Sequence, residues 1–365
     1  MRIGLFGGTF DPVHMGHLIL AENARKLAGL DKVLFMPVNI QPFKQDRKVT
    51  DADDRLRMLA AAVETNACFG VTKIELELSG VSYTIDSLRA FAAKLDPGDE
   101  AVFILGADMF MNIEKWYRSD ELLRDFEIVA GRRPGTDSAE LAGFAAGLKS
   151  RYGARITEVD NPLVDISGTD IRGEASGGGT FRYMVPDDVW RYLYAKGRLP
   201  EKKFAHTKRV MDLAVEWAGK NGVDTHKAWT AALLHDIEKD KGQGVSNDLY
   251  HGRLAAATAK SELGVLDEDT LNAISWHTMG RGGMSRLEMI IFAADTVEPG
   301  RRYKGAERLR KLCEEDLTAG TLQVLIELRD YLERKGILPS DETLEAIAYL
   351  SKMRENSMWG FQTSR

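Results

Sequence analysis

The sequence of 365 residues is poor in cysteine: only Cys68 and Cys313 occur, too few for a disulfide framework or a cysteine-rich zinc site. It also lacks an apolar run near the roughly 20 residues of a membrane-spanning helix. Its N-terminus lacks the charged lead, apolar core and cleavage site of a signal peptide. We therefore expect a protein of the reducing cytoplasm that has no membrane partner.

Excess positive charge is absent as well. The chain has 49 Lys and Arg against 55 Asp and Glu, with 25 against 29 in residues 1–200 and 24 against 26 in the remainder. A protein dedicated to nucleic acids needs clustered basic side chains to neutralise phosphates. A nucleic-acid partner is therefore not expected.

The chain is long enough for about two domains. Hydrophobic residues make up 44% of it and charged residues 28%, as in ordinary globular proteins. Up to about residue 195, short apolar runs alternate with helical patterns, which is typical of a doubly wound parallel α/β sheet. The expected strands are Ile3–Phe6, Val33–Met36, Val71–Leu76, Ala101–Leu105, Phe126–Ala130 and Arg155–Val159, and the expected helices are Leu18–Ala28, Asp54–Glu64, Thr84–Leu95 and Ala139–Lys149.

The strand signals stop after Tyr194. A charged stretch with Gly and Pro, Ala195–Lys203, predicts a junction, so we expect domains at 1–197 and 203–355. The second domain is expected to be all-α. Its predicted helices are Ala205–Gly219, Thr225–Asp236, Gly252–Leu263, Asp269–His277, Arg286–Val297, Ala306–Leu317, Leu322–Lys335 and Thr343–Arg354.

The first strand leads into a segment suited to phosphate, GGTFDPVHMGH at residues 7–17. Paired glycines allow a sharp turn and a close approach of backbone amides to a ligand. The next helix begins near His14–His17, so its free amides and positive end favour an anion. Two imidazoles three residues apart share one face of that first turn. The pattern is neither a Walker loop nor a G-x-G-x-x-G fingerprint, and it predicts a polyphosphate pocket.

A second polar segment, ISGTDIR at residues 166–172, follows the last expected strand. Ser167 or Thr169 can cap a short helix, and the Arg172 guanidinium can bind phosphate oxygens. Ligands of α/β sheets bind beyond the carboxyl ends of the strands, so this segment is expected to face the same pocket.

Six motifs occur in the order typical of bacterial nicotinate-mononucleotide adenylyltransferases: GGTFDPVHMGH, SYTIDSL, GAD at 106–108, KWY, GRRPG and ISGTDIR. The first 197 residues resemble that family. The resemblance implies a sheet of the nucleotidyltransferase type and the reaction of ATP, accompanied by Mg²⁺, with nicotinate mononucleotide to give deamido-NAD and diphosphate. Where the family more often has Ser-Ser or Ser-Ala before Thr, this chain has Ser167-Gly168.

The resemblance also implies a role for each motif residue. The expected catalytic residues, which act on the triphosphate, are His14, His17, Lys44 and Arg172. The expected substrate-binding residues are Gly8, Thr9 and Phe10 at the phosphates, Ser167 and Thr169 closing on them, Gly106 and Asp108 at the adenosine, Trp116 stacked on the pyridine ring, Tyr83 and Thr84 at its carboxylate, and Arg133 of GRRPG. The attacking phosphate oxygen is already ionised, so catalysis needs positioning and charge stabilisation rather than a strong base.

The all-α part places histidines and aspartates on separate predicted helices: His206, His235-Asp236, His251, His277 and Asp295. Asp295 ends the apolar run 290–294, and an aspartate there is costly unless it is paired or binds a metal. Imidazole and carboxylate without thiolate suit iron, manganese or zinc, and bundles build metal centres from facing helices. The pattern therefore predicts a divalent-metal centre.

This pattern resembles the HD phosphohydrolase superfamily. With HTMGRGGM and ADTVEPGRRYKG, it is similar to the HD-type symmetrical diadenosine-tetraphosphate hydrolases of bacteria over residues 203–355. The resemblance implies hydrolysis of diadenosine tetraphosphate to two ADP and a pair of iron ions. The implied metal ligands are His206, His235, Asp236 and Asp295 for one ion, and His251 and His277 with a bridging, catalytic Asp236 for the other. Lys239 and Arg301 or Arg302 are expected to bind substrate phosphates.

Several alternatives stay open at this point. The first domain could accept phosphopantetheine or nicotinamide mononucleotide, and the second could cleave another nucleotide or only sense nucleotides. The expected partners are ATP, nicotinate mononucleotide and diadenosine tetraphosphate. The sequence decides neither the identity of the metal nor the oligomeric state, for which a homo-oligomer is left open.

Overall fold

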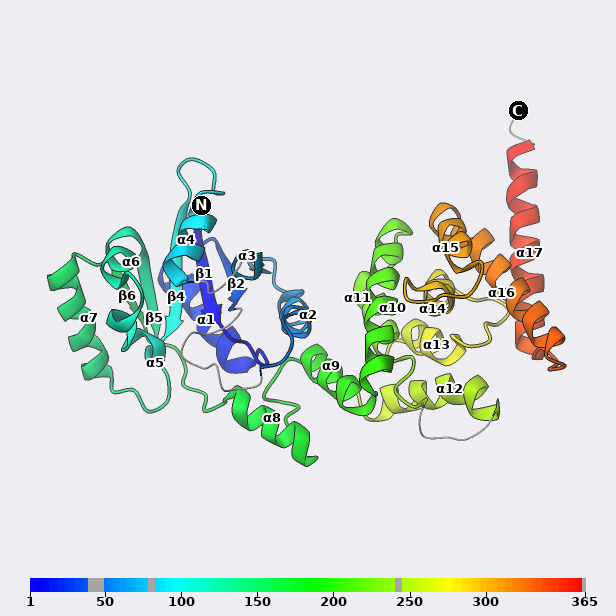
Figure 1. Cartoon of the computed structure of the whole chain (residues 1–365), viewed down its shortest axis with the longest axis horizontal. Helices are drawn as coiled ribbons and strands as arrows, with labels where there is room; N and C mark the ends of the chain where they lie inside the picture. Colours follow the sequence, from blue (N-terminus) through cyan, green and yellow to red (C-terminus); the bar gives the residue numbers. More distant parts are fainter. Residues whose placement is uncertain (39–48, 78–82, 240–244, 363–365) are drawn as a thin grey trace. The chain divides into compact units, whose positions relative to one another are not determined.

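The computed structural model describes residues 1–38, 49–77, 83–239 and 245–362, and the chain divides into two compact units, Met1–Leu193 and Tyr194–Arg365 (Figure 1). Across these described ranges, no helix combines the length and the apolar character needed to cross a membrane.

The N-terminal unit is built on a parallel sheet with the strand order β3-β2-β1-β4-β5-β6, which confirms the predicted doubly wound α/β fold. Its strands are β1 (Arg2–Gly8), β2 (Lys32–Pro37), β3 (Phe69–Val71), β4 (Glu100–Gly106), β5 (Glu127–Gly131) and β6 (Ile156–Val159). The order reverses between β1 and β4, and the carboxyl ends of strands at such a switch point are where ligands bind in open α/β sheets.

Both faces of this sheet are buried. Leu5 of β1 belongs to a core cluster with Leu88 of α4 and Leu122 of α6. Phe6 points to the opposite face, where it is 2% exposed and packs against Phe35 with the two rings tilted by 43°. The helices around the sheet are α1 (Met15–Leu27), α2 (Ala52–Val63), α3 (Ile74–Glu77), α4 (Thr84–Ala92), α5 (Ala107–Phe110), the 3₁₀ helix η1 (Ile113–Lys115), α6 (Ser119–Asp125), α7 (Ser138–Tyr152), α8 (Gly168–Gly177) and α9 (Asp187–Arg198).

The structure differs from the predicted elements at two places. The expected strand Val71–Leu76 stops at Val71, because the Thr72 hydroxyl accepts the backbone N–H of Ile74 and starts the short helix α3 instead. The expected junction is mostly helical, since α9 continues to Arg198 and α10 begins at Glu201. The boundary between the two compact units falls within α9.

The C-terminal unit is helical, as predicted, and α14 lies at its centre. Eight apolar side chains of α14, on all sides of the helix, are buried, and α14 packs against α10, α11, α13, α15 and α16. A helix that is apolar all round is stable only when neighbours cover it. The helices are α10 (Glu201–Lys220), α11 (Thr225–Leu234), α12 (Val245–Ser261), α13 (Glu268–Trp276), α14 (Arg286–Val297), α15 (Ala306–Glu315), α16 (Leu317–Arg334) and α17 (Asp341–Gln362).

Candidate functional site

The N-terminal unit contains a cavity of about 690 Å³ at the carboxyl ends of β1 and β4. Every predicted catalytic or substrate-binding residue of this unit that the structure describes lines the cavity: Gly8, Thr9, Phe10, His14, His17, Tyr83, Thr84, Gly106, Asp108, Trp116, Arg133, Ser167, Thr169 and Arg172. Lys44 lies outside the described residues. The topology therefore brings together residues that are up to 164 positions apart in the sequence.

His14 and His17 stack at the first turn of α1, with ring centroids 3.7 Å apart. Burial, followed by the charge of Arg133, lowers the pKa of His14 to about 4, and burial holds the pKa of His17 well below its usual value. Both rings are therefore neutral near pH 7. The backbone N–H of His14 donates to Nδ1 of His17 at 3.3 Å. The neutral His17 ring consequently carries its proton on Nε2, where it can donate to a phosphate oxygen.

Phe10 shapes the loop from inside the core. Its ring is 1% exposed and packs edge-on against Phe6 and His17, while its backbone takes a left-handed φ of 49°. A Cβ atom at Gly8 would lie 2.8 Å from this ring, so only glycine fits beneath it. The Phe10 side chain thus fixes the loop that borders the cavity.

Helix α8 carries the ISGTDIR segment to the same loop. Ser167 caps the helix, because its hydroxyl accepts the backbone N–H of Asp170 at 3.1 Å. Arg172 donates to the backbone carbonyl of Asp11. A Cβ at Gly168 would lie 2.6 Å from that carbonyl oxygen, so glycine allows α8 to approach the loop between β1 and α1 more closely than serine would.

Three aromatic side chains, Tyr83, Trp116 and Tyr117, also line the cavity. Trp116 is half-buried and contacts Phe103 edge-on, with centroids 6.1 Å apart. Tyr83 pairs with Tyr117 at 4.2 Å, and both are partly exposed at the cavity wall. Sequence reasoning missed Tyr117, although its position directly after Trp116 was a usable signal.

Arg55 is a second residue that sequence reasoning missed. It is 2% exposed, and its guanidinium donates to the carbonyls of Thr50 at 3.0 Å and of Thr9 and Val38 at 2.8 Å. Arg55 therefore ties together three segments that border the cavity. The signal was its spacing three residues before Met58, which places it on the apolar face of α2.

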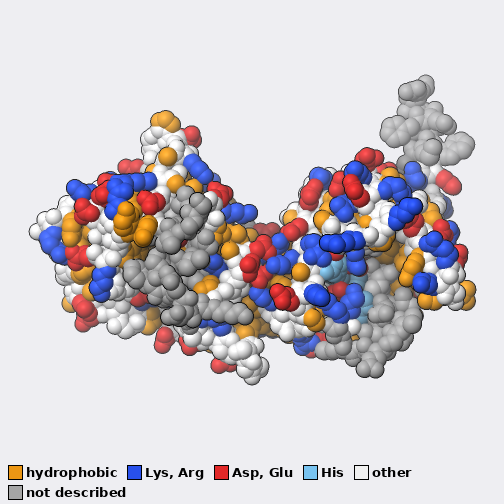
Figure 2. Space-filling model, viewed as in Figure 1, with side chains coloured by type: hydrophobic (Ala, Val, Ile, Leu, Met, Phe, Trp, Pro, Cys, Tyr) orange, Lys and Arg blue, Asp and Glu red, His pale blue; other side chains and the backbone are white. Residues whose placement is uncertain are grey.

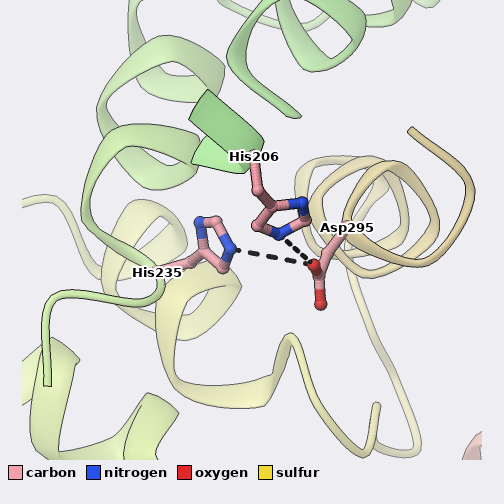
Figure 3. A group of neighbouring side chains, drawn as sticks. All are labelled: His206, His235 and Asp295. Atoms are coloured by element: carbon pink, nitrogen blue, oxygen red, sulfur yellow. Dashed lines mark hydrogen bonds and ion pairs between the residues drawn. The ribbon is translucent and has the colours of Figure 1, made fainter. Parts of the chain in front are cut away.

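The C-terminal unit brings all six predicted metal ligands into one cluster. Two overlapping triads have candidate ligand atoms within 4.8 Å of one another: His206, His235 and Asp295, and His235, Asp236 and His277. In the first triad (Figure 3), the distance to Oδ1 of Asp295 is 2.9 Å from Nε2 of His206 and 3.8 Å from Nε2 of His235. Nε2 of His251 completes the cluster, 2.9 Å from Oδ1 of Asp236 and 3.0 Å from Nε2 of His277.

The cluster has the properties of a divalent-metal site. Nε2 of His235 is buried and has no hydrogen-bond partner among the described residues, although carboxylate oxygens lie 3.6 and 3.8 Å away. Burial lowers the pKa of His235 to about 4, so this nitrogen carries a free lone pair. Burial opposes the charge of Asp236 and Asp295, yet the neighbouring imidazoles hold the pKa of both carboxyls well below the usual range. A neutral imidazole such as that of His235, and ionised carboxylates such as those of Asp236 and Asp295, are donors that divalent ions require.

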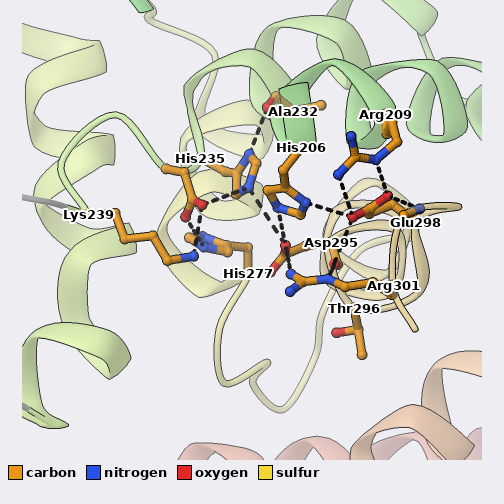
Figure 4. Close-up of polar contacts among 12 residues, drawn as sticks. His206, Arg209, Ala232, His235, Lys239, His277, Asp295, Thr296, Glu298 and Arg301 are labelled. Atoms are coloured by element: carbon orange, nitrogen blue, oxygen red, sulfur yellow. Dashed lines mark hydrogen bonds and ion pairs between the residues drawn. The ribbon is translucent and has the colours of Figure 1, made fainter. Parts of the chain in front are cut away.

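Basic side chains surround this cluster, and Figure 2 shows Lys and Arg atoms beside the visible histidine atoms of the C-terminal unit. Lys239 lies 2.8 Å from Oδ2 of Asp236, and Arg301 lies 2.9 Å from Oδ1 of Asp295 (Figure 4). Both residues were predicted to bind phosphate, and both contact candidate metal ligands in this structure. Sequence reasoning missed Glu298 and Arg209, which also belong to this network.

Comparison with known proteins gives separate matches for the two units. Residues 5–174 match the cytidylyltransferase-like family and residues 204–300 match the HD domain. A probable nicotinate-nucleotide adenylyltransferase of Thermoanaerobacter sp. (strain X514) is 40% identical over 193 residues, 53% of this chain and 92% of the relative. Another, of Exiguobacterium sibiricum, is 42% identical over 52% of this chain and 94% of the relative.

Two solved structures are also similar to parts of the chain. One, described as a predicted HD superfamily hydrolase involved in NAD metabolism from Clostridium acetobutylicum, is 37% identical over 45% of this chain and 96% of its own, with a TM-score of 0.42. The nicotinic acid mononucleotide adenylyltransferase of Plasmodium falciparum is 15% identical over 52% of this chain and 92% of its own, also with a TM-score of 0.42.

Proposed function

The chain belongs, through its N-terminal unit, to the nicotinate-nucleotide adenylyltransferase family and carries an HD domain after it, and we propose that it is a bifunctional enzyme. The N-terminal unit transfers the adenylyl group of ATP to nicotinate mononucleotide in NAD biosynthesis. The C-terminal unit hydrolyses diadenosine tetraphosphate to two ADP.

In the first reaction, a phosphate oxygen of nicotinate mononucleotide attacks the α-phosphorus of ATP, and the bond to the leaving diphosphate breaks. The neutral His17 ring donates from Nε2 to the triphosphate, and Arg172 supplies positive charge to the diphosphate. The loop of Gly8 and Thr9, beside the N-terminus of α1, presents backbone N–H groups to the phosphates. Mg²⁺ bound to ATP neutralises part of its charge.

Recognition of the pyridine ring is assigned to the part of the cavity lined by Trp116, Tyr83 and Thr84. Trp116 offers a half-buried face for stacking the pyridine ring, and the backbone at Tyr83 and Thr84 meets its carboxylate. Gly106 and Asp108 meet the adenosine. The observation that carries this assignment is that all these residues line one cavity with the phosphate loop.

Side-by-side assays of the acceptors test the substrate. Nicotinate mononucleotide, nicotinamide mononucleotide and phosphopantetheine are each supplied with ATP, and diphosphate release is measured. The proposal requires the highest kcat/KM with nicotinate mononucleotide. A preference for either of the others would assign the cavity to a different acceptor.

The second reaction is proposed for the imidazole–carboxylate cluster, with two iron ions as the native metals. His206, His235 and Asp295 would hold one ion, and His251 and His277 with a bridging Asp236 the other. Divalent ions held there supply Lewis acidity toward a phosphate group and lower the pKa of water. Water adds to a central phosphorus, the bond to the bridging oxygen breaks, and that oxygen takes a proton as the second ADP leaves.

The basic residues around the cluster orient the substrate. Lys239 and Arg301 each contact a carboxylate that would hold a metal. Their charges would therefore lie beside the attacked phosphates of a bound substrate. The single observation that supports this reaction is the convergence of six buried or half-buried ligand side chains on one cluster.

Metal analysis and product analysis test the second reaction together. Purified full-length protein should contain about two iron ions per chain and convert diadenosine tetraphosphate to ADP as the only nucleotide product. Formation of ATP and AMP would exclude symmetrical cleavage. Tight binding of the nucleotide without turnover by the metal-loaded protein would identify a sensing module instead of a hydrolase.

A further inference from the structure

The histidines of the metal cluster differ in what holds the ring nitrogen that faces away from the cluster. Nδ1 of His235 lies 2.7 Å from the carbonyl oxygen of Ala232, and Nδ1 of His277 lies 2.8 Å from that of Ile274. His206 uses a carboxylate instead, with its Nδ1 3.0 Å from Oε1 of Glu298 (Figure 4).

The helices explain this difference. His235 and His277 directly follow α11 and α13, and the last four carbonyls of a helix have no N–H partner within it. His206 lies in the second turn of α10, where the carbonyls are already used by the N–H groups of the helix. Its ring therefore needs an acceptor from another element, and Glu298 at the end of α14 provides one.

Glu298 is fixed by more donors than an ordinary surface carboxylate. It is 2% exposed, and it accepts from Nε of Arg209 at 2.5 Å, from Nη2 of Arg209 at 3.2 Å and from the backbone N–H of Gly300. His206 and Arg209 are three residues apart on α10, so one face of this helix holds the carboxylate from two sides.

Gly300 makes room for this arrangement. A Cβ atom at this position would lie 2.4 Å from Nε of Arg209 and 2.6 Å from its Cζ, so the guanidinium lies directly against the Gly300 backbone. The Glu298 carboxylate is thus locked by Arg209 on one side and by the backbone on the other, and it is aimed at His206.

We propose that Glu298 is a positioning residue for the divalent ion that His206, His235 and Asp295 would hold. It keeps the His206 proton on Nδ1, leaves Nε2 to bind the ion and fixes the plane of the ring. Arg209 acts through Glu298. This inference rests on the metal centre of the proposed hydrolase. It also distinguishes the two ions, because the binding of only one of them depends on Glu298.

The test measures metal affinity in the full-length chain and does not use activity. Metal-stripped protein is titrated with Co²⁺ in competition with a chelator, and binding is followed by the visible absorption of Co²⁺. We expect Glu298→Ala to lower the affinity of the protein for one of the two Co²⁺ ions about 10–100-fold. Glu298→Gln should lower the affinity for the same ion less, because the amide oxygen of the glutamine still accepts from His206. His206→Ala identifies which ion is affected.

Glu288→Gln is the matched control. Glu288 belongs to α14, which Glu298 directly follows, and like Glu298 it is 2% exposed. It accepts from Arg281 at 2.7 Å with each of its two oxygens. Glu288→Gln and Glu298→Gln should lower the melting temperature of the protein similarly, but only the second should change Co²⁺ binding.

The possible failures are distinguishable. If Glu298→Ala and Glu298→Gln bind Co²⁺ as tightly as the unchanged protein, Glu298 has no positioning role, and the proposed hydrolase stands. If the unchanged protein binds no divalent ion at this cluster, the metal centre itself is wrong, and the inference falls with it.

Discussion

In the N-terminal unit, His14 and His17 stack on each other at a helix N-terminus, and no described carboxylate forms an ion pair with either ring. In the C-terminal unit, Nε2 of His206 and Nε2 of His251 each lie 2.9 Å from a carboxylate oxygen. Histidine side chains are therefore suited to ligands of opposite charge in the two units. Neutral rings at the positive end of a helix suit an anion, whereas rings interleaved with carboxylates suit a cation.

The difference arises from backbone placement rather than from residue type. The loop after β1 leads into the N-terminus of α1, where the positive end of the helix dipole favours an anion. In the helical unit, α10, α12 and α14 carry His206, His251 and Asp295. His235 and His277 directly follow α11 and α13, so side chains rather than backbone groups form this site. The difference between the two sites can therefore be tested by changing one site at a time.

The largest effect is expected for Asp236→Ala. It removes the carboxylate that contacts His251 and His277 through one oxygen and Lys239 through the other. We expect loss of bound metal and a fall in diadenosine-tetraphosphate hydrolysis of about 10³-fold or more, while adenylyl transfer by the same preparation is unchanged. Stoichiometric metal in the variant would contradict the ligand assignment.

His17→Ala is the reciprocal test. Removing a donor that acts on the triphosphate should lower kcat for adenylyl transfer by about 10²-fold. Metal content and hydrolysis should stay the same, because the anion site and the cation site share no residues. An unchanged single-turnover rate with ATP and nicotinate mononucleotide would show that His17 does not act on the triphosphate.

Acidification should destabilise the N-terminal unit through His14. The folded state holds the pKa of His14 at about 4, below the value of roughly 6.5 in an unfolded chain, so the unfolded chain binds more protons between these values. Stability is therefore kept above about pH 6.5 and lost as the pH falls toward 4. We expect a loss of about 2 kcal/mol between pH 7.5 and pH 5 from this group.

Calorimetry of the full-length chain measures that loss, with the N-terminal transition identified as the one that ATP shifts. His14→Gln cannot take up a proton and should reduce the pH dependence of that transition. Equal pH dependence in both proteins would mean that His14 is charged in the folded state.

The smallest effect is expected for Tyr192→Phe. The Tyr192 hydroxyl donates to Asp54 at 2.7 Å, both side chains are buried, and removing the donor should cost the N-terminal unit about 1–2 kcal/mol. Tyr194→Phe is the control, because this hydroxyl, two residues later on α9, donates to Glu262 in the C-terminal unit. The two substitutions should shift different calorimetric transitions, and a shift of the same transition by both would contradict this division.

Sequence patterns predicted the parallel sheet, the helical second unit and the residues of both clusters, because these depend on local periodicity and on residue type. They did not predict Arg55, Glu298 or the pairing of Tyr192 with Asp54. Each of those is a buried polar contact between segments far apart in the sequence, and only the packed fold determines which carbonyl or carboxylate faces which donor. The helix α9 was missed for a related reason, since the Gly197-Arg198 end of its sequence resembles a linker.

Helix α9 also decides where the chain can be cut. Tyr192 is buried with Asp54, whereas Arg198 donates to Glu238, whose side chain is fully buried, at 2.9 Å. A fragment that starts at residue 203 would leave Glu238 without this arginine, and one that stops before residue 192 would deprive Asp54 of its tyrosine. Two independently folding fragments therefore have to overlap, 1–198 and 187–365, with the whole helix present in each.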